Sequence, residues 1–177
     1  MKLLSIVFSF RNEQSNLEEL VKRTSLALKK LDNWNFELIF VNDDSTDSSE
    51  KILIELQKSH PIKIVNMSRR FGVGPCVLAG LVQAKGNAVI YMDSDLQDPP
   101  EIIPQLIERF EKGADVVHTK RTKRLGESKF KMFLTKIAYR VINKTSNIPC
   151  PKLSSIIILL TRFAFAISAN LFKTCSV

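Results

Sequence analysis

Two carboxylates stand one residue apart at the end of a hydrophobic run. Asp93-Ser94-Asp95 directly follows the hydrophobic residues 88–92. Such a pair at the end of a buried strand offers the hard oxygen ligands that a divalent cation prefers, and the cation in turn binds the oxygens of a diphosphate. An isolated Asp-x-Asp is more often a solvated turn, because aspartate is a common turn residue. The rest of the sequence has to decide between these interpretations.

Short β-branched runs alternate with amphipathic segments along the chain. The runs predict buried strands, because they are short, apolar and bounded by polar or turn residues. The expected strands cover residues 3–8, 36–41, 62–65, 88–92 and 114–118. Helical spacing of apolar residues predicts helices within residues 17–31, 52–56, 77–82 and 102–110. This alternation predicts an α/β fold in which helices flank a mainly parallel sheet with right-handed crossovers.

The N-terminal hydrophobic run has some features of a signal peptide. It is short, is interrupted by Ser5 and Ser9, and ends in Arg11-Asn12-Glu13 without a small-residue cleavage site. We therefore interpret it as the first strand.

Polar residues follow four of the expected strands at the point where each strand ends. These segments are Arg11-Asn12-Glu13 and residues 42–47, 68–72 and 93–98. Ligands bind at the carboxyl ends of the strands in open α/β sheets, so the four segments predict one site. Asparagine, aspartate and serine also cap helices, which accounts for Ser45 or Asp47 before the second helix. Capping does not account for the surplus of acidic residues.

Length and composition limit the class of protein. The chain has 177 residues, of which 45% are hydrophobic and 25% charged, and this fits one globular domain with a single core. Cys76, Cys150 and Cys175 lack the close spacing of a zinc cluster or a disulfide framework, which indicates a reducing compartment such as the cytosol. The glycines do not form a dinucleotide-binding fingerprint, which argues against a hydride-transfer enzyme.

The positive charge is concentrated in one segment. The formal net charge is +8, and residues 120–152 contain ten lysines and arginines against Glu127 alone. Nucleic acid, an anionic membrane and a phosphorylated substrate are all suitable partners, and a solvated basic face is the alternative. Within this segment the spacing predicts a basic amphipathic helix over 128–145, which either packs on the domain or lies at a membrane surface.

Four segments together resemble the inverting family 2 glycosyltransferases with the GT-A fold. They are residues 7–13, 40–47, 68–72 and 92–101, and the most specific is Asp-x-Asp-Leu-Gln-x-Pro-Pro-Glu at 93–101. Within the family the chain is most similar to the polyisoprenyl-phosphate sugar synthases, which include the dolichol-phosphate mannose synthases and the bactoprenol glucosyltransferases. The likeness runs from about residue 3 to residue 151. It implies a Rossmann-like, mainly parallel sheet flanked by helices, and no nucleic-acid partner.

The resemblance implies a donor site with a divalent cation. Four positions match the family's nucleotide-sugar site: Phe10, Glu13, Asp43 and Asp93. Asp93, Asp95 and Gln97 match positions that hold Mg²⁺ or Mn²⁺ against the diphosphate. The implied reaction moves a hexose from a UDP- or GDP-linked sugar to a polyprenyl phosphate with inversion, in cell-envelope glycan biosynthesis.

The resemblance also implies an acceptor site in the basic segment. Arg121, Arg124 and Ser128 match positions near the acceptor and the leaving diphosphate, and Asp95 and Arg121 are the expected catalytic residues. A lipid phosphate has its second pKa at about 6 and is mostly a dianion at neutral pH, so it attacks without a strong base. The implied location is the cytoplasmic face of the membrane, where the helix over 128–145 contacts the membrane surface.

The chain departs from the family at Asp44, at Arg70, at Gly74-Pro75 and after residue 151. Asp44 stands where the family has glycine in Asp-Asp-Gly-Ser, which strains the turn if that residue needs a positive φ. After residue 151 the likeness ends, and residues 152–177 form an apolar tail with Arg162 near its middle. A central arginine costs about 2.5 to 3.5 kcal/mol on insertion, so this is a poor transmembrane segment. We expect residues 1–151 to be the donor-binding part of the catalytic domain. We expect residues 152–177 to be an exposed or loosely packed tail that results from a frameshift or a truncation.

Three alternatives remain beside the lipid-linked transferase. One is an inactive truncated remnant that only binds nucleotide. Another is a transferase that acts on a polysaccharide, another glycan or a protein. A sugar nucleotidyltransferase is disfavoured, because the first strand ends in Phe10-Arg11-Asn12-Glu13 and not in a glycine-rich phosphate loop.

Overall fold

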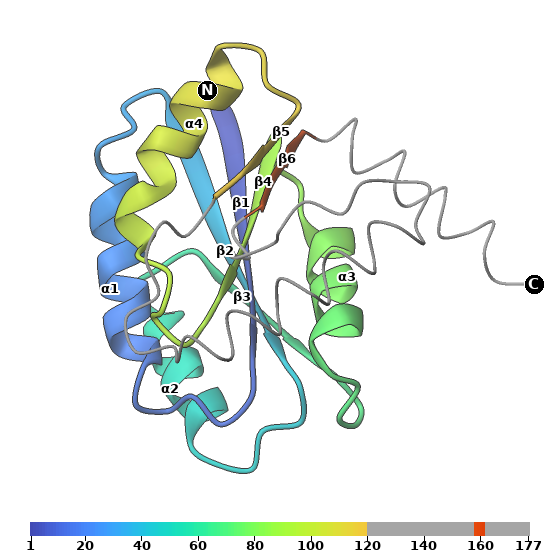
Figure 1. Cartoon of the computed structure of the whole chain (residues 1–177). Helices are drawn as coiled ribbons and strands as arrows, with labels where there is room; N and C mark the ends of the chain where they lie inside the picture. The colour runs from blue at the N-terminus through green and yellow to red at the C-terminus, as the bar shows by residue number, and fades with distance from the viewer. Residues whose placement is uncertain (120–157, 162–177) are drawn as a thin grey trace, which may run out of the picture. The chain divides into compact units, whose positions relative to one another are not determined.

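The computed structural model describes residues 1–119 and 158–161 (Figure 1). In chain order the elements are β1 (Lys2–Phe10), α1 (Leu17–Leu28), β2 (Trp34–Asn42), α2 (Ser49–Leu56), β3 (Ile62–Asn66), α3 (Val73–Gln83), β4 (Ala88–Asp93), the 3-10 turn η1 (Pro100–Ile102), α4 (Ile103–Glu111), β5 (Val116–His118) and β6 (Ile158–Thr161). The five predicted strands and four predicted helices are confirmed. The N-terminal run is a strand, as expected.

The strands form one sheet in the order β3-β2-β1-β4-β6-β5. Strand β1 pairs in parallel with β2 and with β4, and β2 pairs in parallel with β3. Strand β6 is antiparallel to both β4 and β5. This confirms the mainly parallel α/β sheet.

The sequence did not predict β6. Residues 158–161 belong to an apolar run between Ser154-Ser155 and Thr161-Arg162 that was interpreted as part of a tail, and their partners are distant in sequence. These four residues, which belong to the predicted tail, join the sheet between β4 and β5. The domain boundary at residue 151 remains a prediction.

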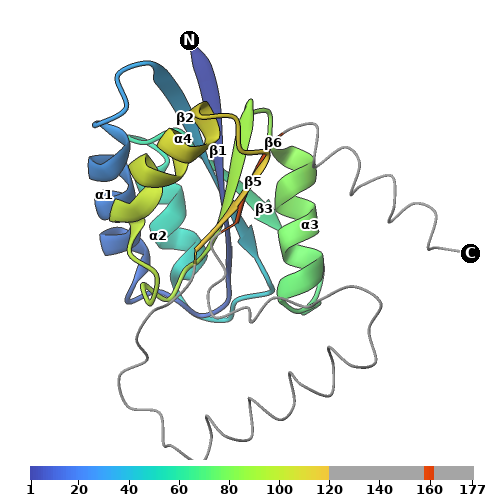
Figure 2. The same cartoon turned by 45° about the horizontal axis from the view of Figure 1, so that its top comes forward.

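Helices cover both faces of the sheet. Helices α1, α2 and α4 lie on one face and α3 lies on the other (Figures 1 and 2). Successive side chains of a strand point to opposite faces, so Leu4, Ile6 and Phe8 of β1 pack in the cluster with α1, α2 and α4. Val7 packs in the second cluster, with Cys76 of α3. Burial on both faces explains why the strands are nearly continuous hydrophobic runs.

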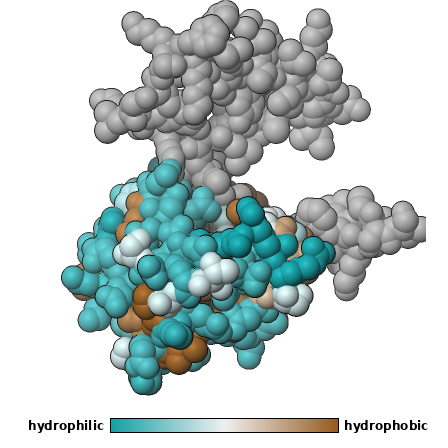
Figure 3. Space-filling model, turned by 90° about the horizontal axis from the view of Figure 1, so that it is seen from below, coloured by the Kyte–Doolittle hydropathy of each residue, from teal (hydrophilic) through white to brown (hydrophobic). Residues whose placement is uncertain are grey.

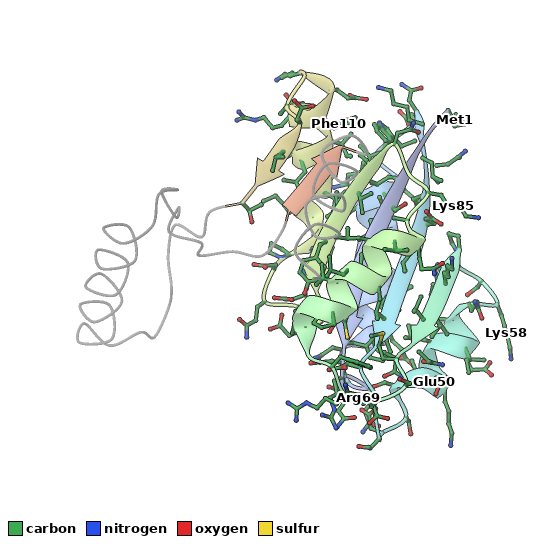
Figure 4. All side chains as sticks on the ribbon, turned by 90° about the vertical axis from the view of Figure 1, so that its right-hand side faces the viewer. Met1, Glu50, Lys58, Arg69, Lys85 and Phe110 are labelled. Atoms are coloured by element: carbon green, nitrogen blue, oxygen red, sulfur yellow. The ribbon has the colours of Figure 1, made fainter. Side chains whose placement is uncertain are left out.

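The strand order reverses beside β1. The chain proceeds from β1 to β2 and β3 on one side and then crosses to β4 on the other side. In open α/β sheets such a reversal leaves a crevice at the carboxyl ends of the strands, where ligands bind. Figure 4 shows Arg69 and Glu50 at this end of the sheet and Met1, Lys85 and Phe110 at the opposite end.

Gly80 allows α3 to approach the sheet closely. A Cβ atom at Gly80 would overlap the side chain of Val7 and lie 3.0 Å from Cγ2 of Val41.

We expect Gly80→Ala to lower the free energy of unfolding by about 1 to 3 kcal/mol, because side chains of β1 or β2 must move. Gly74 is the matched control, because a Cβ there would meet no atom within 4 Å. Urea denaturation of both variants makes the test, and equal midpoints would contradict the close approach.

Candidate functional site

A cavity of about 320 Å³ lies at the carboxyl edge beside the strand reversal. Its residues come from the ends of β1, β2 and β4 and from the first turn of α3. They are Ser9, Phe10, Arg11, Glu13, Asp43, Val73, Cys76, Asp93, Ser94 and Asp95. Figure 3 views this end of the molecule from below, and the described surface there is mostly hydrophilic. The cavity thus brings together residues from three of the four polar segments that the sequence indicated.

Asp43 fixes the start of α3. The main-chain N–H groups of Phe71 and Gly72 donate to its two carboxylate oxygens at 2.6 and 3.0 Å. Burial acts to raise the pKa of Asp43, but the bonds from Phe71, Gly72 and the Cys76 thiol, with the charge of Arg11, lower that pKa below its usual value. Asp43 is therefore ionised at neutral pH and holds one wall of the cavity in place. Its expected contact with the nucleotide remains a prediction.

Cys76 has no features of a nucleophile. Burial, followed by the hydrogen bond to Asp43 and its negative charge, raises the pKa of the Cys76 thiol to about 12. Since the thiolate is the reactive form, the thiol is inert at neutral pH. Its contribution is to pack between α3 and the sheet.

The end of β1 and the loop that follows it are held by hydrogen bonds within the loop and to neighbouring segments. The main-chain N–H of Glu13 donates to Oγ of Ser49 at 2.9 Å, and its side chain accepts a bond from Asn16 at 2.6 Å. The carbonyl oxygen of Phe10 accepts the N–H of Asp43 at 3.0 Å. Glu13 and Phe10 both line the cavity, as the resemblance implied. Their contact with a nucleobase stays a prediction.

Asp93, the last residue of β4, and Asp95, in the loop that follows, both line the cavity. Oη of Tyr91 donates to Oδ1 of Asp93 at 2.7 Å. Oδ1 of Asp95 accepts the main-chain N–H of Gln97 at 3.0 Å, which closes a turn. The loop between them is anchored because the Ser94 hydroxyl donates to the carbonyl oxygen of Ser9 at 2.9 Å.

The side chains of Asp93 and Asp95 suit a cation that also binds the phosphate oxygens of a ligand. Within residues 1–119 and 158–161, no group of three or more histidine, cysteine, aspartate or glutamate side chains is placed to hold a metal ion. Two carboxylates at an open cavity, completed by phosphate oxygens and water, still match the ligands that Mg²⁺ and Mn²⁺ accept. The Gln97 side chain is exposed. Asp93 and Asp95 line the cavity, and Gln97 does not.

Three residues other than glycine have positive φ in the described part of the chain, and all lie in loops at the carboxyl edge. They are Asn12 at 56°, Asp44 at 58° and Leu96 at 60°. Asp44 therefore has the positive φ at which strain was expected, where the family has glycine. Asn12 joins its loop to the next one, because its N–H donates to Ser45 at 3.1 Å and its side chain accepts the N–H of Thr46 at 2.8 Å. These bonds hold strained backbone in place.

Asp47 has the helix-starting role that the sequence suggested. Its Oδ1 accepts the N–H of Ser49, the first residue of α2, at 3.0 Å. Its Oδ2 accepts the N–H of Gln14 at 3.2 Å, so the same side chain also ties the loop after β1 to α2.

Arg11 is a cavity residue to which the sequence assigned no role. Its Nε is buried and has no hydrogen-bond partner within the described residues, although Arg11 lines the cavity. Buried donors are normally bonded, so this one is suited to an acceptor on a ligand. Its position directly after β1, in one of the four polar segments, was the signal in the sequence that indicated a site residue.

The sequence analysis also missed Tyr91, because a tyrosine inside a hydrophobic strand has the appearance of a core residue.

The remaining predicted site residues lie outside the described residues. They are Arg121, Arg124 and Ser128, and the predicted basic helix over 128–145 lies there too. Among the residues that the structure describes, no helix is both long enough and apolar enough to cross a membrane.

Comparison with known proteins defines the class. A model of the glycosyl transferase family 2 domain matches residues 5–167, and the chain belongs to that family. The match extends past residue 151, where the likeness had been expected to end.

Curated relatives are similar to most of this chain. An uncharacterized glycosyltransferase of Synechocystis is 44% identical over 149 residues, covering 84% of this chain and 46% of that protein. A prophage bactoprenol glucosyl transferase homolog of Escherichia coli is 37% identical, with coverages of 81% and 47%. A dolichol-phosphate mannosyltransferase of Pyrococcus furiosus is 33% identical, with coverages of 86% and 43%. The chain spans about half the length of the curated relatives it matches.

Solved structures share the fold. A mannosyltransferase from Pyrobaculum calidifontis, in complex with GDP-Man and Mn²⁺, gives a TM-score of 0.64 at 16% identity, covering 95% of this chain and 46% of that one. Glucosyl-3-phosphoglycerate synthase from Mycobacterium tuberculosis, in complex with Mn²⁺, UDP and phosphoglyceric acid, gives 0.65 at 19% identity, with coverages of 98% and 65%. The GT-A fold that the resemblance implied is confirmed.

Asp43 should make stability depend on pH. Asp43→Asn removes charge-assisted hydrogen bonds and should lower the free energy of unfolding at neutral pH by about 2 kcal/mol. Because the pKa of Asp43 is lowered in the folded state, this stabilisation is complete above the unfolded pKa of about 4 and is lost as the pH falls through the folded pKa. Urea denaturation across this range should therefore show the gap between wild type and variant closing in acid.

The control for this prediction is Asp44→Asn, which removes a neighbouring exposed carboxylate at a position where asparagine tolerates positive φ. It should change stability at neutral pH by less than about 0.5 kcal/mol. A gap between wild type and Asp43→Asn that stays constant with pH would contradict the role given to the ionised carboxylate.

Proposed function

We propose that this protein transfers a hexose from a UDP- or GDP-linked sugar to a polyprenyl phosphate, with inversion at the anomeric carbon. The observation that carries the proposal is the pair Asp93 and Asp95 at the cavity beside the strand reversal, in a chain of family 2. The acceptor class is supported by relatives named bactoprenol glucosyl transferase, dolichol-phosphate mannosyltransferase and undecaprenyl-phosphate 4-deoxy-4-formamido-L-arabinose transferase.

The cavity would receive the nucleoside diphosphate. In this proposal Phe10, Glu13 and Asp43 border the nucleoside at the ends of β1 and β2, and Asp93 lies nearer the ribose and diphosphate. The buried Nε–H of Arg11 would donate to an acceptor on the nucleotide. Fold neighbours solved with GDP-Man and Mn²⁺ and with UDP and Mn²⁺ support the assignment to a donor.

Asp93, Asp95 and Gln97 would hold Mg²⁺ or Mn²⁺. When bound, the cation supplies positive charge that stabilises the departing diphosphate. The two aspartates already line the cavity, whereas Gln97 has to turn toward it or act through water. These residues therefore bind and orient the leaving group.

The chemical step needs alignment more than a strong base. An oxygen of the acceptor phosphate attacks the anomeric carbon, and the bond from that carbon to the diphosphate breaks with its electron pair leaving on the nucleoside diphosphate. The acceptor is mostly a dianion at neutral pH, since its second pKa is about 6. We propose that Arg121, Arg124 and Ser128 contact the phosphates, because guanidinium groups bind two oxygens at once. The basic helix over 128–145 would place the acceptor end of the site at the cytoplasmic membrane surface.

Calorimetric titration with UDP and GDP, with and without Mn²⁺, tests this function. We expect one of the nucleotides to bind in a metal-dependent manner, and Asp95→Asn to weaken that binding by at least about ten-fold through loss of a charged ligand. Asp32→Asn is the matched control, because Asp32 is exposed and precedes the amino end of β2.

A transfer assay with polyprenyl phosphate and the sugar of the preferred nucleotide completes the test. Transfer that Asp95→Asn abolishes is the expected result. Full transfer in that variant would refute the metal site, and nucleotide binding without transfer to any lipid phosphate would favour a nucleotide-binding remnant or a glycan acceptor.

A further inference from the structure

Tyr91 places a hydroxyl group beside the cavity from within the sheet. Residues 91 and 93 of β4 point to the same face, and the register pairs Asp93 with Ser9 of β1. The Tyr91 hydroxyl donates to Oδ1 of Asp93 at 2.7 Å and lies 3.0 Å from Oγ of Ser9. A phenol has one proton, so the Ser9 hydroxyl is the donor in the second bond. The three side chains form a short network that leads from the core to the cavity.

The Tyr91 ring is held by rigid elements. The residue is 4% exposed and packs in the cluster between the sheet and α3, with Val7, Val89 and Cys76. A phenylalanine would fill this space without burying a hydroxyl, which costs free energy unless it is bonded. Packing therefore accounts for the ring but not for the hydroxyl. The bonds that the hydroxyl makes are to two residues that line the cavity.

The carboxylates of Asp93 and Asp95 are held in different ways. Asp95 is exposed and accepts a main-chain N–H from its own loop. Asp93 is partly buried and accepts a bond from a side chain anchored in the core. A carboxylate fixed by a rigid donor keeps one orientation before the ligand arrives, and such preorganisation strengthens binding.

We infer that Tyr91 is a positioning residue, which acts through Asp93 to orient that carboxylate toward the cation and the nucleoside diphosphate. The inference rests on the proposed function, because it assigns Asp93 to the donor site. Groups that hydrogen-bond to a metal-binding carboxylate typically change metal affinity by 10- to 100-fold. Tyr91 has this role although it touches neither the cation nor the substrate.

Tyr91→Phe tests the inference, since it keeps the ring and removes the hydroxyl. The affinity for Mn²⁺ is measured in the presence of the preferred nucleotide, by the loss of the electron paramagnetic resonance signal of free Mn²⁺. We expect Tyr91→Phe to weaken it by about ten-fold, with a melting temperature close to that of wild type. Thr24→Val is the matched control, because it removes a buried hydroxyl on α1, which lies on the opposite face of the sheet. It should leave Mn²⁺ affinity unchanged.

A double-mutant cycle separates positioning from a general effect on the fold. If Tyr91 acts through Asp93, adding Tyr91→Phe to Asp93→Asn should change Mn²⁺ affinity by less than about two-fold. Equal effects in both backgrounds, or wild-type affinity in Tyr91→Phe alone, would overturn the inference and leave the proposed function standing. Absence of Mn²⁺-dependent nucleotide binding by the folded wild-type protein would overturn both.

Discussion

The parallel pairing of β1 with β2 on one side and β4 on the other is the constraint on which the cavity depends. The register opposes Phe10 to Asn42 and Ser9 to Asp93, so the three strands end together. A slip of one residue in β4 would turn Tyr91 and Asp93 to the opposite face, away from α3. Close packing on both faces opposes such a slip, because side chains of different size and shape would exchange places in the two clusters. The core therefore fixes the relative positions of the cavity side chains.

The carboxyl edge of the sheet carries conformations and groups that folding alone does not favour. Asn12, Asp44 and Leu96 have positive φ, Arg11 has a buried donor without a partner in the described part of the chain, and Tyr91 buries a hydroxyl. Departures from local preference are expected at functional sites, where they are held by the surrounding structure. Their concentration at one edge agrees with a binding site at the cavity.

Most of the fold could be predicted because local patterns determine it. The strands from β1 to β5 are short hydrophobic runs with polar boundaries, and the helices have clear apolar stripes. Strand β6 was not predicted, because a short strand within an apolar run cannot be distinguished from a tail or a helix by its pattern alone. The place of residues 158–161 depends on pairing with distant strands.

The site could be predicted in part, because local patterns in the sequence also mark some of its residues. Asp93 and Asp95 are recognisable because they directly follow a strand, and both line the cavity. Two other features could not be predicted. The contact of Cys76 with Asp43 depends on how closely α3 packs on the sheet, and the role of the Tyr91 hydroxyl depends on which groups the tip of a core side chain reaches. Gln97 followed from resemblance, and the cavity lining does not include it.

The central claim is that the cavity beside β1 binds a nucleoside diphosphate together with a divalent cation. Crystals grown with Mn²⁺ and UDP or GDP, measured for anomalous scattering of manganese, test it most directly. The account predicts a manganese peak beside Asp93 and Asp95, with the diphosphate next to it and the nucleoside toward Asp43. A nucleotide bound elsewhere on the protein, or manganese distant from both aspartates, would contradict it.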